Sequence, residues 1–247
     1  MDNLNEKDFT DELRLTFEKN GLSPLLNEER EKMFYLLTDR MLTENKKYNL
    51  TAITEPSKII LNHYADCAAI EAKFKKNATV IDVGCGAGFP TLPLAIVRPD
   101  LQILAIDSTA KRIAYVSETA EILGLPNVKA AVMRAEDGGK NPQLRESFDY
   151  ATARAVAELR ILCELCIPFV KVGGKMIAMK GRNAQDELEG ARHGIGLLGG
   201  KGCRIEQMDL IGADGEVFTH PLVTVDKTSA TPKNLPRPFS QISKKPL

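Results

Sequence analysis

The sequence predicts an α/β protein whose central sheet is mostly parallel and flanked by helices. From residue 76 onwards, short apolar runs alternate with helical stretches, which is the pattern of strand–helix–strand units. One of these runs, 79–83, leads directly into a turn that carries three glycines. Residues 5–75 show helical periodicity instead. We therefore expect an N-terminal helical extension (1–75), an α/β core (76–226) and a C-terminal tail (227–247).

The N-terminal extension should contain three helices. In the first, aromatic and aliphatic residues recur every four positions before Gly21, a typical C-terminal cap. The second should begin near Asn27 and run through Met41. Pro56 favours the first turn of a third helix, which should continue through His63.

Seven short apolar segments in the core should form strands, with a helix over 109–123 between the second and third. The last two segments should form a hairpin that turns at 213–215. The predicted strands are 79–83, 102–106, 128–133, 148–153, 174–180, 203–211 and 217–225.

Composition narrows the class of protein. No segment approaches the roughly 20 apolar residues needed to span a bilayer. The polar start Met1–Glu6 is not followed by an apolar run, so no signal peptide is expected. Five irregularly spaced cysteines indicate free thiols in a reducing compartment. A cytoplasmic protein is therefore expected, and the net charge of +0 does not point to nucleic acid.

The tail has a distinct composition, with basic residues and prolines and no acidic residue after 226. Because proline disfavours a helix interior, we expect an extended conformation. The tail could be an arm that contacts phosphates or simply a solvated terminus. Its basic residues are Lys227, Lys233, Arg237, Lys244 and Lys245.

The glycine turn follows Asp82 and places glycines at alternate positions, Gly84, Gly86 and Gly88. A dinucleotide-binding fingerprint would have its third glycine at position 89, where this chain has Phe89. The D-x-G-x-G-x-G pattern is instead the first motif of methyltransferases that use S-adenosylmethionine (SAM). A structural turn that binds no ligand is the alternative.

Asp107 follows the second predicted strand, 23 residues after Gly84. A carboxylate at this strand end can accept hydrogen bonds from both hydroxyls of an adenosine ribose. It could instead cap the next helix. Asp107 would also suit an NAD-dependent oxidoreductase, so the glycine spacing carries the preference for SAM.

A set of segments, in order, resembles the bacterial RsmG family, formerly called glucose-inhibited division protein B. The resemblance extends from about residue 25 to the end of the chain. The segments are Tyr48–Thr51, Asp82–Pro90, Arg134–Asp137, Thr152–Ala157, Ala178–Gly181, Thr231–Lys233 and Lys244–Leu247. Two departures from the family are a threonine, Thr91, where a glycine is common, and an altered sequence around Arg237 and Phe239.

The resemblance implies a class I SAM-dependent methyltransferase fold with a seven-stranded sheet. It also implies methylation of guanine N7 in 16S ribosomal RNA, with that RNA or the small ribosomal subunit as the partner. No membrane partner or oligomer is implied. The family suggests cofactor contacts at Gly84, Phe89, Ala135, Glu136 and Arg154, to which the motifs above add Gly86, Gly88 and Asp107.

The predicted chemistry needs neither a general base nor a nucleophile, because guanine N7 is an acceptor with a free lone pair. Catalysis should rest on positioning. Arg154 is the predicted catalytic residue, placed on the cofactor carboxylate or an RNA phosphate because it would repel a sulfonium. The target base should be unpaired or extruded, and Phe89 or Tyr48 could stack on it.

Two other interpretations have less support in the sequence. A non-catalytic RNA-binding module would keep the basic tail but would not need the full glycine set. His63, Asp66 and Cys67 share a helix face, yet no further ligand pair has matching spacing, so no metal site is predicted.

Overall fold

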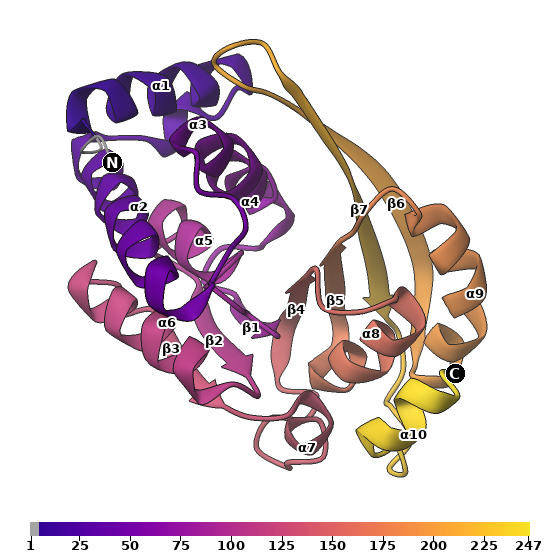
Figure 1. The fold of residues 1–247 in the computed structure, drawn as a ribbon. Helices are drawn as coiled ribbons and strands as arrows, with labels where there is room; N and C mark the ends of the chain where they lie inside the picture. The colour runs from indigo at the N-terminus through magenta and orange to yellow at the C-terminus, as the bar shows by residue number, and fades with distance from the viewer. Residues whose placement is uncertain (1–4) are drawn as a thin grey trace.

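A computed structural model describes residues 5–247 of the chain, and its centre is a seven-stranded sheet in the order β3-β2-β1-β4-β5-β7-β6 (Figure 1). The first five strands are parallel to one another, and β7 is antiparallel to both β5 and β6. The predicted mostly parallel sheet and the C-terminal hairpin are therefore confirmed. The strands are β1 (Thr79–Val83), β2 (Gln102–Asp107), β3 (Val128–Val132), β4 (Phe148–Arg154), β5 (Val170–Met179), β6 (Gly200–Ile211) and β7 (Val217–Lys227).

Helices cover both faces of the sheet, because side chains of a strand alternate between the two faces. In β1, Val80 belongs to the apolar core on one face, whereas Ile81 and Val83 belong to the core on the other. The first face is covered by the N-terminal helices together with α5 (Thr91–Val97) and α6 (Ala110–Ile122). The second is covered by α8 (Leu159–Cys166), η4 (Ile167–Phe169) and α9 (Ala184–Leu197). A short helix, α7 (Ala135–Gly138), follows β3.

The N-terminal extension contains α1 (Glu6–Lys19), η1 (Ser23–Leu25) and α2 (Glu28–Tyr48), as the sequence indicates. Asn5 caps α1 and Asn27 caps α2, each through its side-chain oxygen. The third helix begins at Pro56 as predicted but continues beyond His63. It consists of α3 (Pro56–Ile59), a π-helical turn η2 (Ile60–Ala65) and α4 (Asp66–Ala68), and is followed by η3 (Glu71–Lys73).

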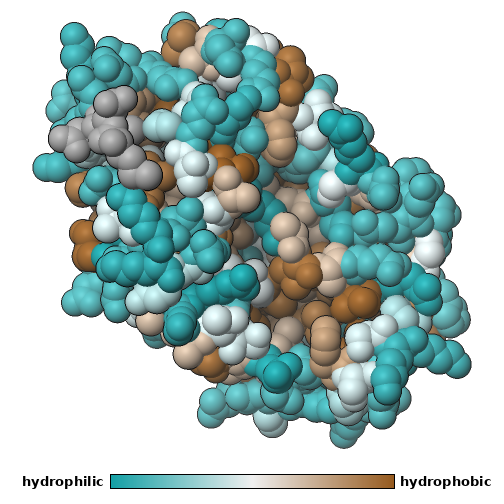
Figure 2. Space-filling view, viewed as in Figure 1, coloured by the Kyte–Doolittle hydropathy of each residue, from teal (hydrophilic) through white to brown (hydrophobic). Residues whose placement is uncertain are grey.

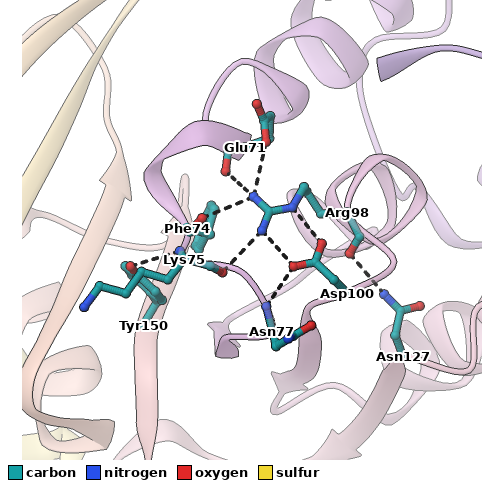
Figure 3. Close-up of polar contacts among 8 residues, drawn as sticks. All are labelled: Glu71, Phe74, Lys75, Asn77, Arg98, Asp100, Asn127 and Tyr150. Carbon is teal, nitrogen blue, oxygen red and sulfur yellow. Dashed lines mark hydrogen bonds and ion pairs between the residues drawn. The ribbon is translucent and has the colours of Figure 1, made fainter. Parts of the chain in front are cut away.

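Arg98, just after α5, joins the extension to the amino ends of the strands (Figure 3). Its guanidinium donates to the carbonyl oxygens of Glu71, Phe74 and Lys75 at 2.8, 3.2 and 3.2 Å. Two further donors reach Asp100, at 2.7 and 2.8 Å. One side chain therefore satisfies the last carbonyls of the helical extension where the chain enters the sheet.

The predicted extended tail is wrong, because Phe239–Lys244 form a helix, α10. The prolines do not prevent it, since Pro238 precedes its first residue and Pro246 lies beyond its end. The tail is not a solvated terminus either. Arg237 donates twice to Glu164, whose side chain is 0 % exposed. The tail is therefore packed on α8, while Lys233, Lys244 and Lys245 remain exposed.

Within residues 5–247, no helix is long and apolar enough to cross a membrane.

Candidate functional site

A cleft of ≈ 460 Å³ opens at the carboxyl ends of the parallel strands. In this view, apolar surface gathers in the hollowed middle of the molecule, and the outer rim is hydrophilic (Figure 2). The glycine turn after β1, the end of β2, the segment after β3 and the end of β4 all contribute to its lining. The structure brings together these predicted site residues: Gly84, Gly86, Phe89, Asp107, Ala135, Glu136 and Arg154.

The three glycines of the turn have different surroundings, although all have positive φ, at 72°, 57° and 87°. A Cβ on Gly84 would meet Val156 at 2.8 Å, and one on Gly88 would meet Leu92 at 2.6 Å. A Cβ on Gly86 would have only the Gly84 carbonyl oxygen within reach, at 3.9 Å. Gly86 thus leaves space in the cleft for a ligand, while Gly88 lies outside the lining and allows close packing.

Asp107 places a buried carboxylate at the cleft. Its oxygens accept hydrogen bonds from the backbone N–H of Gly86 at 3.2 Å and of Thr109 at 2.8 Å. The contact with Thr109 is not a helix cap, because Thr109 is itself the N-cap residue of α6 and this helix has no side-chain cap hydrogen bond. Oδ2 also lies 3.5 Å from the Arg112 guanidinium, whereas Oδ1 keeps a second lone pair that can accept from a ribose hydroxyl.

Arg154, at the end of β4, is held by the π-helical turn of the extension. Its guanidinium donates to the Asn62 carbonyl oxygen at 2.9 Å, to Asp66 at 3.2 Å and to Nδ1 of His63 at 3.0 Å. It also lies over the Phe89 ring, 5.0 Å from the centroid. Arg154 is therefore fixed at the cleft wall by contacts that the sequence did not predict.

His63 is neutral at physiological pH, because burial, and secondarily the charge of Arg154, lowers its pKa to about 3. Since Nδ1 accepts from Arg154, Nε2 carries the proton and donates to the Thr51 hydroxyl at 3.2 Å. The imidazole stacks on Phe89 with centroids 4.4 Å apart. His63 therefore forms part of the cleft wall together with Phe89.

Several cleft residues escaped prediction from the sequence. Ala155 lines the cleft with φ 55°, a conformation that non-glycine residues adopt only when neighbours enforce it and that gathers at functional sites. Met133 and Arg134 line it beside Ala135. Phe239, from the tail, lines it from a position more than 80 residues away from Arg154 in the chain, and no local pattern signals that contact.

Other predicted residues lie elsewhere. Tyr48 is exposed and outside the cleft lining, so it is neither core nor positioned on the cleft wall. Cys163 and Cys166, which form a C-x-x-C in the sequence, are both buried in the second core. Among residues 5–247, His, Cys, Asp and Glu form no group of three that could hold a metal ion.

The fold of this chain is one that solved methyltransferases of low sequence identity share. The fold is shared with a precorrin-6y C5,15-methyltransferase from Geobacter metallireducens GS-15, at a TM-score of 0.51 and 13% identity over 73% of this chain and 92% of that one. A SAM-dependent O-methyltransferase from Thermotoga maritima gives a TM-score of 0.52 and 14% identity over 78% of this chain and 72% of that one. The cleft suits the cofactor, because Gly86 leaves room for it and Asp107 offers acceptors.

The particular family follows from sequence comparison, and the chain belongs to the family described as rRNA small subunit methyltransferase G, matched over residues 30–209. A ribosomal RNA small subunit methyltransferase G from Clostridium perfringens (strain 13 / Type A) is 48% identical over 90% of this chain and 92% of that protein. One from an Exiguobacterium species (strain ATCC BAA-1283 / AT1b) is 41% identical over 99% of this chain and 100% of that protein. The suspected RsmG membership is confirmed, and the alternatives of an oxidoreductase or a non-catalytic module find no support.

Proposed function

We propose that this chain acts in the cytoplasm on 16S ribosomal RNA, free or in the small subunit, and methylates a guanine at N7. Bound SAM supplies the methyl group from its positively charged sulfonium. The N7 lone pair forms the new bond to the methyl carbon, while the carbon–sulfur bond breaks and its electrons remain on sulfur. No proton leaves the base in this step, so no general base is needed.

The observation that carries the proposal is the state of two side chains that line the cleft, His63 and Cys85. His63 has its pKa lowered to about 3 and bonds Arg154 through Nδ1, so it is a poor proton acceptor. Burial raises the pKa of the Cys85 thiol, the cysteine that lines the cleft, so it is a poor nucleophile. A site with neither a general base nor a nucleophile suits methylation at a nitrogen that already has a free lone pair.

The residues of the site act by positioning. Gly84 and Gly86 let the turn approach the cofactor, Asp107 holds the ribose hydroxyls, and Ala135 and Glu136 lie where the adenine would follow. Arg154 and Phe89 lie together in the cleft wall, and Arg154 would bind the cofactor carboxylate or an RNA phosphate. Alignment of reacting atoms can contribute several kcal/mol, on the order of 7–11 in favourable cases.

The test is transfer of isotope-labelled methyl from SAM to small-subunit RNA and particles that lack the modification, followed by digestion and mass spectrometry of the nucleosides. We expect label in N7-methylguanosine. Gly86→Leu should abolish the label, because its side chain would fill the cleft. Gly124→Leu is a matched control, since Gly124 also has positive φ and open surroundings but lies outside the cleft lining. Label in another nucleoside would disprove the N7 assignment.

A further inference from the structure

A second cavity of ≈ 300 Å³ adjoins the cofactor cleft, and we call it the side pocket. His63, Arg154 and Ala155 line both cavities, so the two cavities share a wall. Its volume is near the lower end for small-ligand pockets, which begin at about 300 Å³. The residues that line only the side pocket are Ile53, Asn62, Asp66, Met179, Lys180, Gly181, Phe218 and His220.

Residues that line the side pocket carry buried polar atoms without hydrogen-bond partners. These are Oδ1 of Asn62, Oδ1 of Asp66 and both ring nitrogens of His220. Asp66 is 2 % exposed and His220 5 % exposed. His220 Nδ1 lies 2.7 Å from Asp66 Oδ1, but the pair lacks the alignment of a hydrogen bond. Buried polar groups are usually paired, so a cluster of unpaired ones indicates a ligand.

The types of these atoms match one nucleobase. The Watson–Crick edge of guanine offers the O6 acceptor followed by two donors, N1–H and N2–H. Asn62 and Asp66 provide two acceptors, and the imidazole of His220 provides one donor. Adenine would not match these protein groups, because its Watson–Crick edge has a donor at N6 and an acceptor at N1.

We propose that the side pocket binds the Watson–Crick edge of the extruded target guanine, with Asn62 and Asp66 accepting from N1–H and N2–H and His220 donating to O6. N7 lies on the opposite side of the six-membered ring from N2, so a base held in this way turns N7 towards the shared wall. The inference rests on the proposed function and adds how the base is selected.

Asp66 also has an electrostatic role in the proposed site. The methylated guanine carries the positive charge that was on sulfur, so positive charge appears on the base beside Arg154. Asp66 pairs with Arg154 at 3.2 Å and offsets its charge. A carboxylate on N1–H is bound more strongly as the base becomes cationic, so Asp66 stabilises the transition state more than the bound base.

The experiment compares the wild-type chain with Asn62→Leu and His220→Phe, using small-subunit particles that lack the modification. Both changes remove unpaired buried atoms, so the melting temperature should stay the same or rise. SAM affinity should be unchanged, and kcat/KM for the RNA substrate should fall by about tenfold or more. His193→Phe is the matched control, because His193 is exposed on α9 and should behave as the wild type. Asp66→Asn should lower kcat more than it raises KM.

Wild-type kcat/KM in both Asn62→Leu and His220→Phe would overturn the inference. A loss of turnover that follows a loss of SAM binding or of thermal stability would overturn it as well. Failure of the proposed function is visible separately, because the wild-type chain would then give no N7-methylguanosine, and the base assignment would fall with it.

Discussion

At the scale of single residues, the buried carboxyl of Asp82 stabilises the strand end that leads into the glycine turn. Asp82 is fully buried in β1 and accepts hydrogen bonds from Thr91 at 2.6 Å and Thr152 at 3.3 Å. Thr91, where the family commonly has glycine, thus supplies a donor to a buried acid two residues before Gly84. Burial raises the pKa of Asp82 to about 6 despite these hydrogen bonds.

Replacing Asp82 should change how stability depends on pH. The folded pKa of about 6 lies above the ordinary value of 3.8, so the stabilising contribution of the protonated carboxyl is lost as the pH rises from about 4 to about 6. Asp82→Asn imitates the protonated form. We expect the variant to exceed the wild type in free energy of unfolding at pH 7.5, by up to about 3 kcal/mol, and to match it near pH 4. Denaturant unfolding across this range measures it, and a pH-independent difference would contradict the assignment.

At the scale of elements, the junction made by Arg98 ties the helical extension to the sheet far from the site. Arg98 contacts residues at the amino ends of the strands, whereas the cleft lies at their carboxyl ends (Figure 3). The extension carries Thr51 and His63, which line the cleft. The junction therefore stabilises the fold without touching the ligand.

Arg98→Met should separate stability from binding. Loss of charge-assisted hydrogen bonds to carbonyls and to Asp100 should cost about 2–3 kcal/mol of unfolding free energy, while the SAM dissociation constant stays unchanged. Arg192→Met is the control, since Arg192 pairs with Glu189 at the surface and should give no measurable change. Denaturant unfolding curves measure the free energy of unfolding, and calorimetric titration measures the SAM dissociation constant. A large loss of SAM affinity in Arg98→Met would show that the junction also shapes the cleft.

The elements that the sequence predicted are those with a visible period or a clear boundary. The strands around the glycine turn were found because they are short, apolar and bounded by turn residues. Helix α5 was not, because all seven of its residues are buried and Pro93 interrupts the pattern, so no polar face marks it. The π-helical turn that holds Arg154 has no local signature either. The motif residues of the cleft can be predicted from the sequence. The cluster of Asn62, Asp66 and His220 cannot, because it forms only where β7 packs against the N-terminal extension, far away in the sequence.

At the scale of the whole molecule, the tail returns to the site after the sheet is complete. Lys227 is 2 % exposed and donates to the Leu198 carbonyl oxygen at 2.9 Å. Arg145 gathers the carbonyl oxygens of Thr231, Pro232 and Leu235. Arg237 then reaches Glu164, and Phe239 follows at the cleft, 42 % exposed. Basic residues expected to contact phosphate thus serve, in part, to fix the tail.

Two substitutions in the tail should separate its anchoring from its contribution to the cleft. Arg237→Ala removes the guanidinium that pairs with the buried Glu164 and leaves this carboxylate only the backbone N–H of residue 237. The loss should cost about 3–5 kcal/mol of unfolding free energy, with weaker SAM binding because the tail loosens. Phe239→Ala removes a partly exposed side chain and should change stability by less than about 0.5 kcal/mol. It should nevertheless weaken SAM binding several-fold, because Phe239 lines the cleft. Lys245→Ala, exposed and outside the cleft, is the control. Wild-type SAM affinity in Phe239→Ala would mean that the tail only stabilises the fold.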